Sequence, residues 1–118
     1  MLYGRAGDIA MRVRFEPGEQ ELYRSPLTPF GASLFRSIPR VVLVTNQRII
    51  TYLDDNGAIN DISWVWLKDI RHLSCHQAAN ILGMQYWIDV GSESYFLKKR
   101  EQRDQLAAVI ERSVDQLP

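Results

Sequence analysis

The sequence has little cysteine and no surplus of charge of either sign. Its single cysteine, Cys75, cannot form a disulfide within the chain, so nothing here requires an oxidising compartment. Acidic and basic residues balance at 14 each. Domains that bind nucleic acid are usually strongly basic, so this balance argues against a nucleic-acid partner. At 118 residues, the chain fits one domain that can bury a core without cross-links.

Long apolar runs are also lacking. The first residues do not contain the continuous apolar stretch of a signal peptide. No run approaches the roughly 20 apolar residues that a membrane-spanning helix needs. These absences predict a cytoplasmic protein, whose contact with a membrane, if it makes one, is peripheral.

What the sequence does contain is alternation of apolar and polar residues, the pattern of half-buried β-strands. The alternating segments are separated by turn-forming pairs such as Pro17-Gly18 and Asn46-Gln47. One segment, Arg40–Thr45, is apolar at almost every position, which predicts a strand that is covered on both faces. Strands are expected at residues 20–25, Arg40–Thr45, 48–53, 59–67, 70–76, 84–90 and Glu93–Leu97, and residues 32–36 form either a short strand or part of a loop.

Two further signals define the ends of the fold. Asn56-Gly57 between two strand-like segments predicts a type I′ hairpin, because both residues tolerate positive φ. Near residue 100 the apolar period changes from two to 3.6, which predicts a helix at residues 100–116 with Leu106 and Ile110 on its apolar stripe. A meander of about seven strands tends to curl into a barrel, and the helix can bury its stripe by closing one end.

Four short motifs occur along the chain. They start at Phe15 and reach into the predicted helix. The motifs are Phe15-Glu16-Pro17-Gly18-Glu19; Val42-Leu43-Val44-Thr45-Asn46-Gln47-Arg48-Ile49-Ile50; Leu67-Lys68-Asp69-Ile70-Arg71-His72-Leu73; and Phe96-Leu97 followed by Arg103-Asp104-Gln105-Leu106.

In this order the motifs resemble the opening turn, the hairpin signature, the corner and the strand-to-helix ending of bacterial pleckstrin-homology-like (PH and GRAM-type) domains. The resemblance implies a mainly β fold with one C-terminal α-helix: a seven-stranded, partly open barrel of two near-orthogonal antiparallel sheets capped by the helix. It places this domain at residues 15–118, after an N-terminal arm at residues 1–14. It also implies recognition of lipid head groups, peptides or copies of itself, with no catalysis and no cofactor.

The sequence departs from one subset of these domains. Members that bind phosphoinositides carry a dense lysine and arginine cluster on the first two strands and the loop between them. This chain has only scattered arginines there and no lysine. The resemblance therefore does not extend to a high-affinity inositol-phosphate site.

A candidate binding surface comes from charge segregation. Residues 22–53 contain no acidic residue, whereas acids outnumber bases further along the chain. Basic side chains near an anionic membrane contribute about 1 kcal/mol each, and exposed aromatics beside them could make an apolar contact. The alternative is that the arginines are ordinary solvated side chains and that the aromatics pack under the loop. The candidate binding residues are Arg24, Phe30, Phe35, Arg36, Arg40 and Arg48.

The remaining reactive or aromatic residues suggest structural roles. His72 and His76 would share one strand face while Cys75 points to the other, so they do not make a metal site or a nucleophile-base pair. Cys75 is expected in the core, and core packing is also the simpler interpretation of Trp64 and Trp66. No metal is expected.

The sequence therefore predicts a non-catalytic interaction domain. Its ligand is a protein partner, with self-association included, or an anionic membrane surface. Residues 1–14 contain strand-like alternation, so the arm could add a strand to an open sheet edge in its own chain or a neighbouring one. The alternative function is a carrier of a small ligand or lipid inside the β-barrel, which requires an apolar cavity of about 300 Å³ or more.

Overall fold

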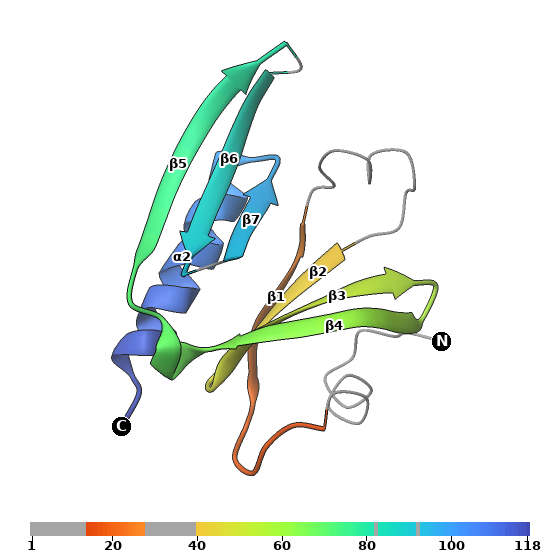
Figure 1. The fold of residues 1–118 in the computed structure, drawn as a ribbon, viewed down its shortest axis with the longest axis vertical. Coiled ribbons are helices and arrows are strands. Elements are labelled where there is room, and N and C mark those ends of the chain that lie inside the picture. Colours follow the sequence, from red (N-terminus) through yellow and green to blue (C-terminus); the bar gives the residue numbers. More distant parts are fainter. Residues whose placement is uncertain (1–13, 28–39, 82, 92) are drawn as a thin grey trace.

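The computed structural model describes residues 14–27, 40–81, 83–91 and 93–118, which form two antiparallel sheets and a helix (Figure 1). The four-stranded sheet has the order β1-β2-β3-β4, and the three-stranded sheet has the order β5-β6-β7. The elements are β1 (Glu21–Leu27), β2 (Arg40–Thr45), β3 (Arg48–Asp55), β4 (Ala58–Trp66), the 3-10 turn η2 (Leu67–Asp69), β5 (Leu73–Asn80), β6 (Gly83–Val90), β7 (Glu93–Leu97) and α2 (Arg100–Asp115).

The architecture confirms the predicted fold class, mainly β with one C-terminal helix. The two sheets do not close on each other, so the barrel is partly open. The predicted hairpin turn is also confirmed, because Asn56 and Gly57 both have positive φ, at 52° and 98°. The predicted N-terminal arm and the predicted segment at residues 32–36 lie outside the described residues, apart from Arg14.

One strand was placed wrongly. The sequence pattern predicts a strand at residues 70–76 and a connection at 77–80, whereas β5 runs from Leu73 to Asn80. Ala78 and Ala79 have low intrinsic β propensity, so they resemble a connection when read alone. In the fold they pair with Gln85 and Met84 of β6, and this pairing determines their conformation.

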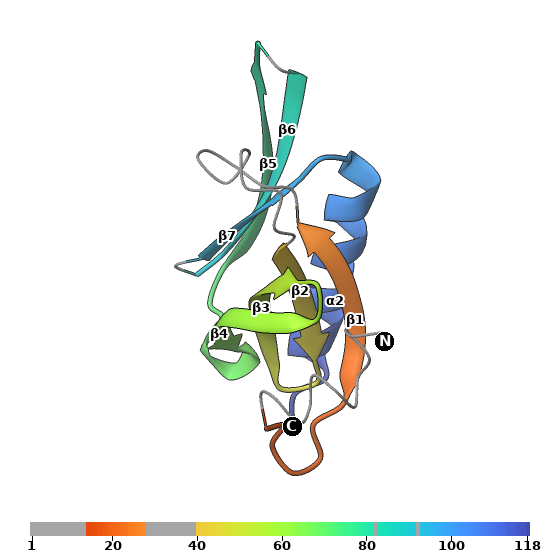
Figure 2. The same cartoon turned by 90° about the vertical axis from the view of Figure 1, so that its right-hand side faces the viewer.

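Helix α2 packs across both sheets and buries one apolar stripe (Figure 2). Leu106 and Ile110 of this stripe are fully buried. They meet residues from both sheets in one core cluster, among them Val44 from β2 and Ile88 from β6. The helix therefore packs against both sheets, which are joined in the chain through η2 and also meet where β7 lies beside β1.

Strand β2 is covered on both faces, as its continuous apolar sequence predicts. Val42 and Val44 belong to the core cluster below α2. Val41 and Leu43 point to the other face, where they form a second cluster with Ile50 and Tyr52 of β3, packed against Phe15, Ile59 and Ile62. The four-stranded sheet thus has two apolar faces along its central strands.

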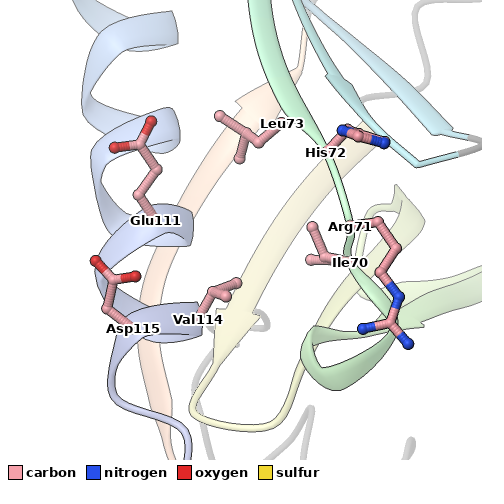
Figure 3. Close-up of a pocket in the computed structure, with 7 residues that line it drawn as sticks. All are labelled: Ile70, Arg71, His72, Leu73, Glu111, Val114 and Asp115. Carbon is pink, nitrogen blue, oxygen red and sulfur yellow. The ribbon is translucent and has the colours of Figure 1, made fainter.

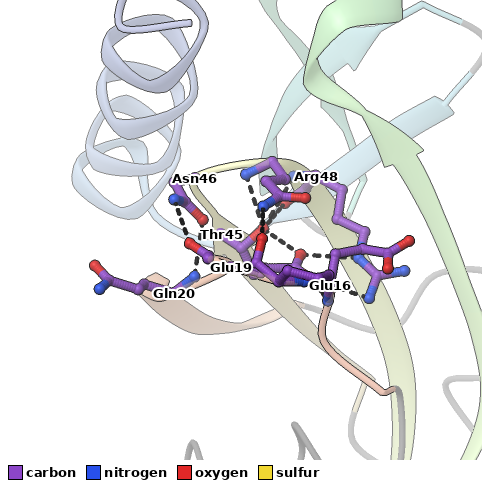
Figure 4. A network of polar contacts seen from close by, with 9 residues as sticks. Glu16, Glu19, Gln20, Thr45, Asn46 and Arg48 are labelled. Carbon is purple, nitrogen blue, oxygen red and sulfur yellow. Dashed lines mark hydrogen bonds and ion pairs between the residues drawn. The ribbon is translucent and has the colours of Figure 1, made fainter.

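A buried ion pair fixes the turn before β1 to the β2–β3 hairpin (Figure 4). Glu19 accepts hydrogen bonds from Nε and Nη2 of Arg48 at 2.9 and 3.0 Å, and the Arg48 side chain is only 3% exposed. The Thr45 hydroxyl donates to the same carboxylate at 2.6 Å, and the backbone N–H of Glu16 donates at 2.8 Å. Both carboxylate oxygens of Glu19 therefore accept two hydrogen bonds each, as a buried carboxylate requires.

The neighbouring Asn46 reinforces this junction through backbone contacts. Its Oδ1 accepts the N–H of Gln20 at 2.8 Å, and its Nδ2 donates to the carbonyl of Gly18 at 3.0 Å. Two of the four motifs that carry the resemblance, the opening turn and the hairpin signature, thus meet in one hydrogen-bonded network. Their residue types are explained by this contact.

The indoles of β4 complete the surroundings of Arg48. Its guanidinium carbon lies 4.8 Å from the centre of the Trp64 ring and 5.1 Å from that of Trp66. This placement is favourable, since an aromatic face attracts a cation. The sequence predicts that both indoles pack in the core. Trp64 is instead 46% exposed and Trp66 is half-buried.

Burial by itself would raise the pKa of Glu19, but the hydrogen bonds from Arg48, Thr45 and the Glu16 N–H lower it below its ordinary value of 4.5. A carboxyl whose pKa is lower in the folded state stabilises the fold above the pKa of the unfolded chain. This stabilisation is lost as the pH falls through the folded pKa. The ion pair therefore contributes to stability at neutral pH and less in acid.

We expect Glu19→Gln to lower the free energy of unfolding near pH 7 by about 3–5 kcal/mol, because it leaves the Arg48 guanidinium buried without its counter-charge. The deficit relative to the wild type should shrink as the pH falls below about 4.5. Urea unfolding followed by tryptophan fluorescence measures both effects. Glu16→Gln, which changes an exposed side chain, is the matched control. Equal stability of the two variants at pH 7 would contradict the prediction.

Candidate functional site

The structure does not gather the predicted arginines into one free basic cluster. Arg24 hydrogen-bonds to Glu21 on its own strand, with Nε 3.1 Å from Oε2. Arg40, at the start of β2, pairs with Asp61 of β4 at 3.3 Å. Arg48 lies at the opposite end of the β2–β3 hairpin and is buried with Glu19. Each of these three arginines therefore has a carboxylate partner.

The other predicted site residues, Phe30, Phe35 and Arg36, lie outside the described residues. The binding surface at residues 22–53 thus stays a prediction.

The outer strands of the two sheets provide a different candidate. In the described part of the chain, β1 and β4 are the outer strands of one sheet, and β5 and β7 those of the other. An outer strand presents unpaired N–H and C=O groups that can pair with another chain. Proteins usually prevent this with bulges, prolines, charges or short strands.

Three of the four outer strands carry such protection. β1 contains Pro26 and a bulge near Leu22. β4 carries a bulge at Asp61, whose φ is 53°, and the exposed carboxylate of that residue. β7 has only five residues and lies beside β1. These edges are poor templates for an added strand.

Strand β5 lacks every one of these features. Its eight residues include no proline, lysine, aspartate or glutamate, and its register with β6 is continuous from Leu73 to Asn80. The side chains of residues 74–79 are all exposed. Figure 1 shows β5 and β6 as a long hairpin that projects beyond α2. Among the described strands, β5 is therefore the edge that has no protective feature in its own sequence.

The hydrogen-bond register shows which backbone groups face outward. The His72 carbonyl accepts the N–H of Gly91 from the end of β6. In an antiparallel ladder alternate residues point towards the partner strand, so Ser74 and His76 face β6. Cys75, Gln77 and Ala79 then direct their N–H and C=O groups away from the sheet.

The far end of this hairpin is apolar. Ile81 is fully exposed and Met84 is 44% exposed. Two residues after Met84 on the same strand face, Tyr86 lies under the guanidinium groups of Arg100 and Arg103, at 5.8 and 5.4 Å from its ring centre. Arg100 and Arg103 in the first turn of α2 therefore lie over the face of β6 from which Met84 also projects.

A cleft of about 260 Å³ opens at the other end of β5 (Figure 3). One wall comes from the segment that leads into β5, and the other comes from the last turns of α2. The cleft is lined by Ile70, Arg71, His72, Leu73, Glu111, Val114 and Asp115.

His76 of β5 contacts two side chains of β6. Nε2 of His76 lies 2.9 Å from Oδ2 of Asp89, and the imidazole stacks on Trp87 with 4° between the planes. Cys75 is exposed, contrary to the expectation that it belongs to the core. Partial burial raises the pKa of the Cys75 thiol. The positive charge of Arg103 opposes this rise, and the negative charge of Asp104 adds to it. A thiol with a raised pKa is a weak nucleophile at neutral pH.

Within the described residues, no three His, Cys, Asp or Glu side chains converge as metal ligands would. No helix described here has the length and hydrophobicity needed to cross a membrane.

Comparison with known proteins agrees with the fold. No family model and no curated protein matches the chain. Among solved structures, it is similar to the crystal structure of a pleckstrin homology domain from Shewanella amazonensis SB2B. The TM-score is 0.60 at 13% identity, and the match covers 93% of this chain and 98% of that one. The chain therefore has a pleckstrin-homology-like fold, as its motifs predict.

The raised pKa of Cys75 has a measurable consequence. At about pH 8 we expect iodoacetamide to alkylate this thiol more slowly than a cysteine in an unstructured peptide, because less of it is thiolate. The rate should rise to the peptide value in denaturing urea. Mass spectrometry over time gives both rates. A native thiol that reacts faster than the peptide would contradict the assigned environment.

Proposed function

We propose that this domain is a non-catalytic recognition module that binds protein partners, a second copy included, by accepting an extended segment along β5. The observation that supports it best is the unprotected β5 edge, the one outer strand in the described residues with no bulge, proline, acidic or lysine residue or short length to block pairing. The pleckstrin-homology-like fold favours an interaction role over catalysis.

Strand addition also supplies the two components that peptide recognition needs. The outward N–H and C=O groups of Cys75, Gln77 and Ala79 provide backbone hydrogen bonds to any extended sequence. Side chains beside the edge provide the selectivity, since alternate residues of the added strand would lie over each face of the sheet. Exposed Ile81 and Met84 offer apolar contacts at one end.

The alternative carrier function is less well supported. The cleft at Ile70 and Val114 measures about 260 Å³, is open to solvent, and is lined in part by charged residues. Carriers of small apolar ligands enclose most of the ligand surface in a largely apolar cavity. This cleft does not meet that requirement.

A second candidate, contact with an anionic membrane, is favoured by the hairpin end. Lys98, Lys99 and Arg100 are consecutive and exposed at the start of α2. The exposed apolar residues Ile81 and Met84 lie at the end of the β5–β6 hairpin, and Arg100 contacts the same hairpin at Tyr86. An apolar contact flanked by basic residues is a common arrangement for peripheral membrane binding.

The test of strand addition uses random peptides displayed on phage and selected on the whole chain. We expect Ala79→Pro to weaken the selected peptides by at least about threefold, because proline removes an outward N–H whose hydrogen bond is worth about 0.5–1.5 kcal/mol. Ala79→Val, which keeps that N–H, is the matched control and should bind like the wild type. Isothermal titration calorimetry measures the affinities.

NMR of the bound state decides where the peptides lie. Slowed amide exchange at Cys75, Gln77 and Ala79 would support the proposal, and light scattering would reveal a second copy as the occupant. Peptides that bind Ala79→Pro unchanged and perturb amides away from β5 would overturn it.

The membrane candidate predicts sedimentation with vesicles that contain phosphatidylserine. We expect Lys98→Glu with Lys99→Glu to reduce the bound fraction, since each basic residue contributes about 1 kcal/mol, and added salt to reduce it further. Arg36→Glu with Arg40→Glu is the comparison, because it tests the surface that the sequence predicts. A wild-type chain that stays in solution with these vesicles would exclude both membrane surfaces.

A further inference from the structure

The cleft beside the start of β5 is continuous with the proposed binding edge. Leu73 is both the first residue of β5 and part of the cleft wall. A segment added along β5 therefore reaches the cleft at one of its ends. The opposite wall is the last part of α2, from Glu111 to Asp115.

The cleft is amphipathic. Its apolar lining consists of Ile70, Leu73 and Val114, which are partly buried and pack against the core. Glu111 and Asp115 stand four residues apart on α2, so they lie on one face of the helix. Val114 lies on the same side, and Figure 3 shows it pointing towards Ile70.

Within residues 14–27, 40–81, 83–91 and 93–118, no basic side chain forms an ion pair with the acidic wall. Among the described residues, no ion pair within 4.0 Å involves Glu111 or Asp115, although both line the same cleft as Arg71. With histidine counted as neutral, two carboxylates and one guanidinium leave the lining with a formal excess of one negative charge. A cationic group is therefore the complementary ligand.

We propose that this cleft receives a lysine or arginine side chain from the extended segment that binds along β5, so this inference rests on the proposed function. The aliphatic stem would lie on Leu73 and Val114, and the cation would approach Glu111 and Asp115. Small-molecule sites usually exceed about 300 Å³, so a cleft of about 260 Å³ suits a single long side chain. Lysine and arginine combine an apolar stem with a charged head in this way.

The cleft can be tested without a partner, using n-pentylammonium as a lysine mimic. We expect it to shift the methyl NMR signals of Leu73 and Val114 at millimolar concentration. The neutral analogue 1-pentanol should bind at least about fivefold more weakly. Glu111→Gln combined with Asp115→Asn should remove this preference for the cation. These side chains are exposed at the end of a helix, so the variant should fold normally.

The selected peptides test the same cleft in its proposed context. We expect them to share a lysine or arginine at one position, and replacing it with norleucine should weaken binding about tenfold. The Glu111→Gln and Asp115→Asn double variant should bind the basic and the norleucine peptide equally. Glu101→Gln, in the first turn of α2, is the matched control and should leave the difference intact.

The outcomes separate this inference from the proposed function. Peptides that protect the amides of β5 but show no basic preference would overturn the cleft assignment and leave strand addition standing. Binding of n-pentylammonium without any peptide on β5 would instead overturn strand addition and retain the cation site. Equal binding of 1-pentanol and n-pentylammonium would overturn the cation site. So would an anionic probe, butyrate, that binds beside Arg71 more tightly than n-pentylammonium binds the cleft.

Discussion

The buried ion pair between Glu19 and Arg48 is the constraint on which the four-stranded sheet depends. It joins residues 29 positions apart and connects the turn before β1 to the hairpin between β2 and β3. Thr45 and Asn46 satisfy the remaining polar groups at this junction. Trp64 then lies over the guanidinium from β4, so every strand of this sheet contributes to, or directly adjoins, the same contact. Polar residues in two short motifs thus fasten the turn before β1 to the hairpin between two apolar strands.

The sequence predicts the elements whose conformation depends on neighbouring residues in the chain, such as a tight turn and an amphipathic helix. The hairpin at Asn56-Gly57 follows from the positive φ that both residues tolerate, and α2 follows from an apolar stripe with helical spacing. The extent of β5 could not be predicted, because Ala78 becomes part of a strand only by pairing with β6. The burial of Glu19 was equally hidden. A glutamate in a turn resembles a solvated side chain until its partner is known.

The candidate site was harder to predict than the fold. Counting charges along the sequence drew attention to Arg24 and Arg40, but their carboxylate partners became visible only with the strand pairing and the local geometry. The sequence shows that β5 lacks proline, lysine, aspartate and glutamate. It does not show that β5 is the outer strand of its sheet, because the strand order is known only from the fold. The cleft likewise joins Leu73 to Asp115, two residues far apart in the chain.

The position of α2 in the chain has a consequence for how the protein is made. A nascent chain emerges from the ribosome with its N-terminus first. All the strands described here therefore emerge before the helix that packs on both sheets. Until that helix is available, side chains such as Val44 and Ile88 lack the cover that Leu106 and Ile110 provide. The nascent sheets therefore expose apolar surface during synthesis, and the completed fold depends on a step that follows translation of residue 110.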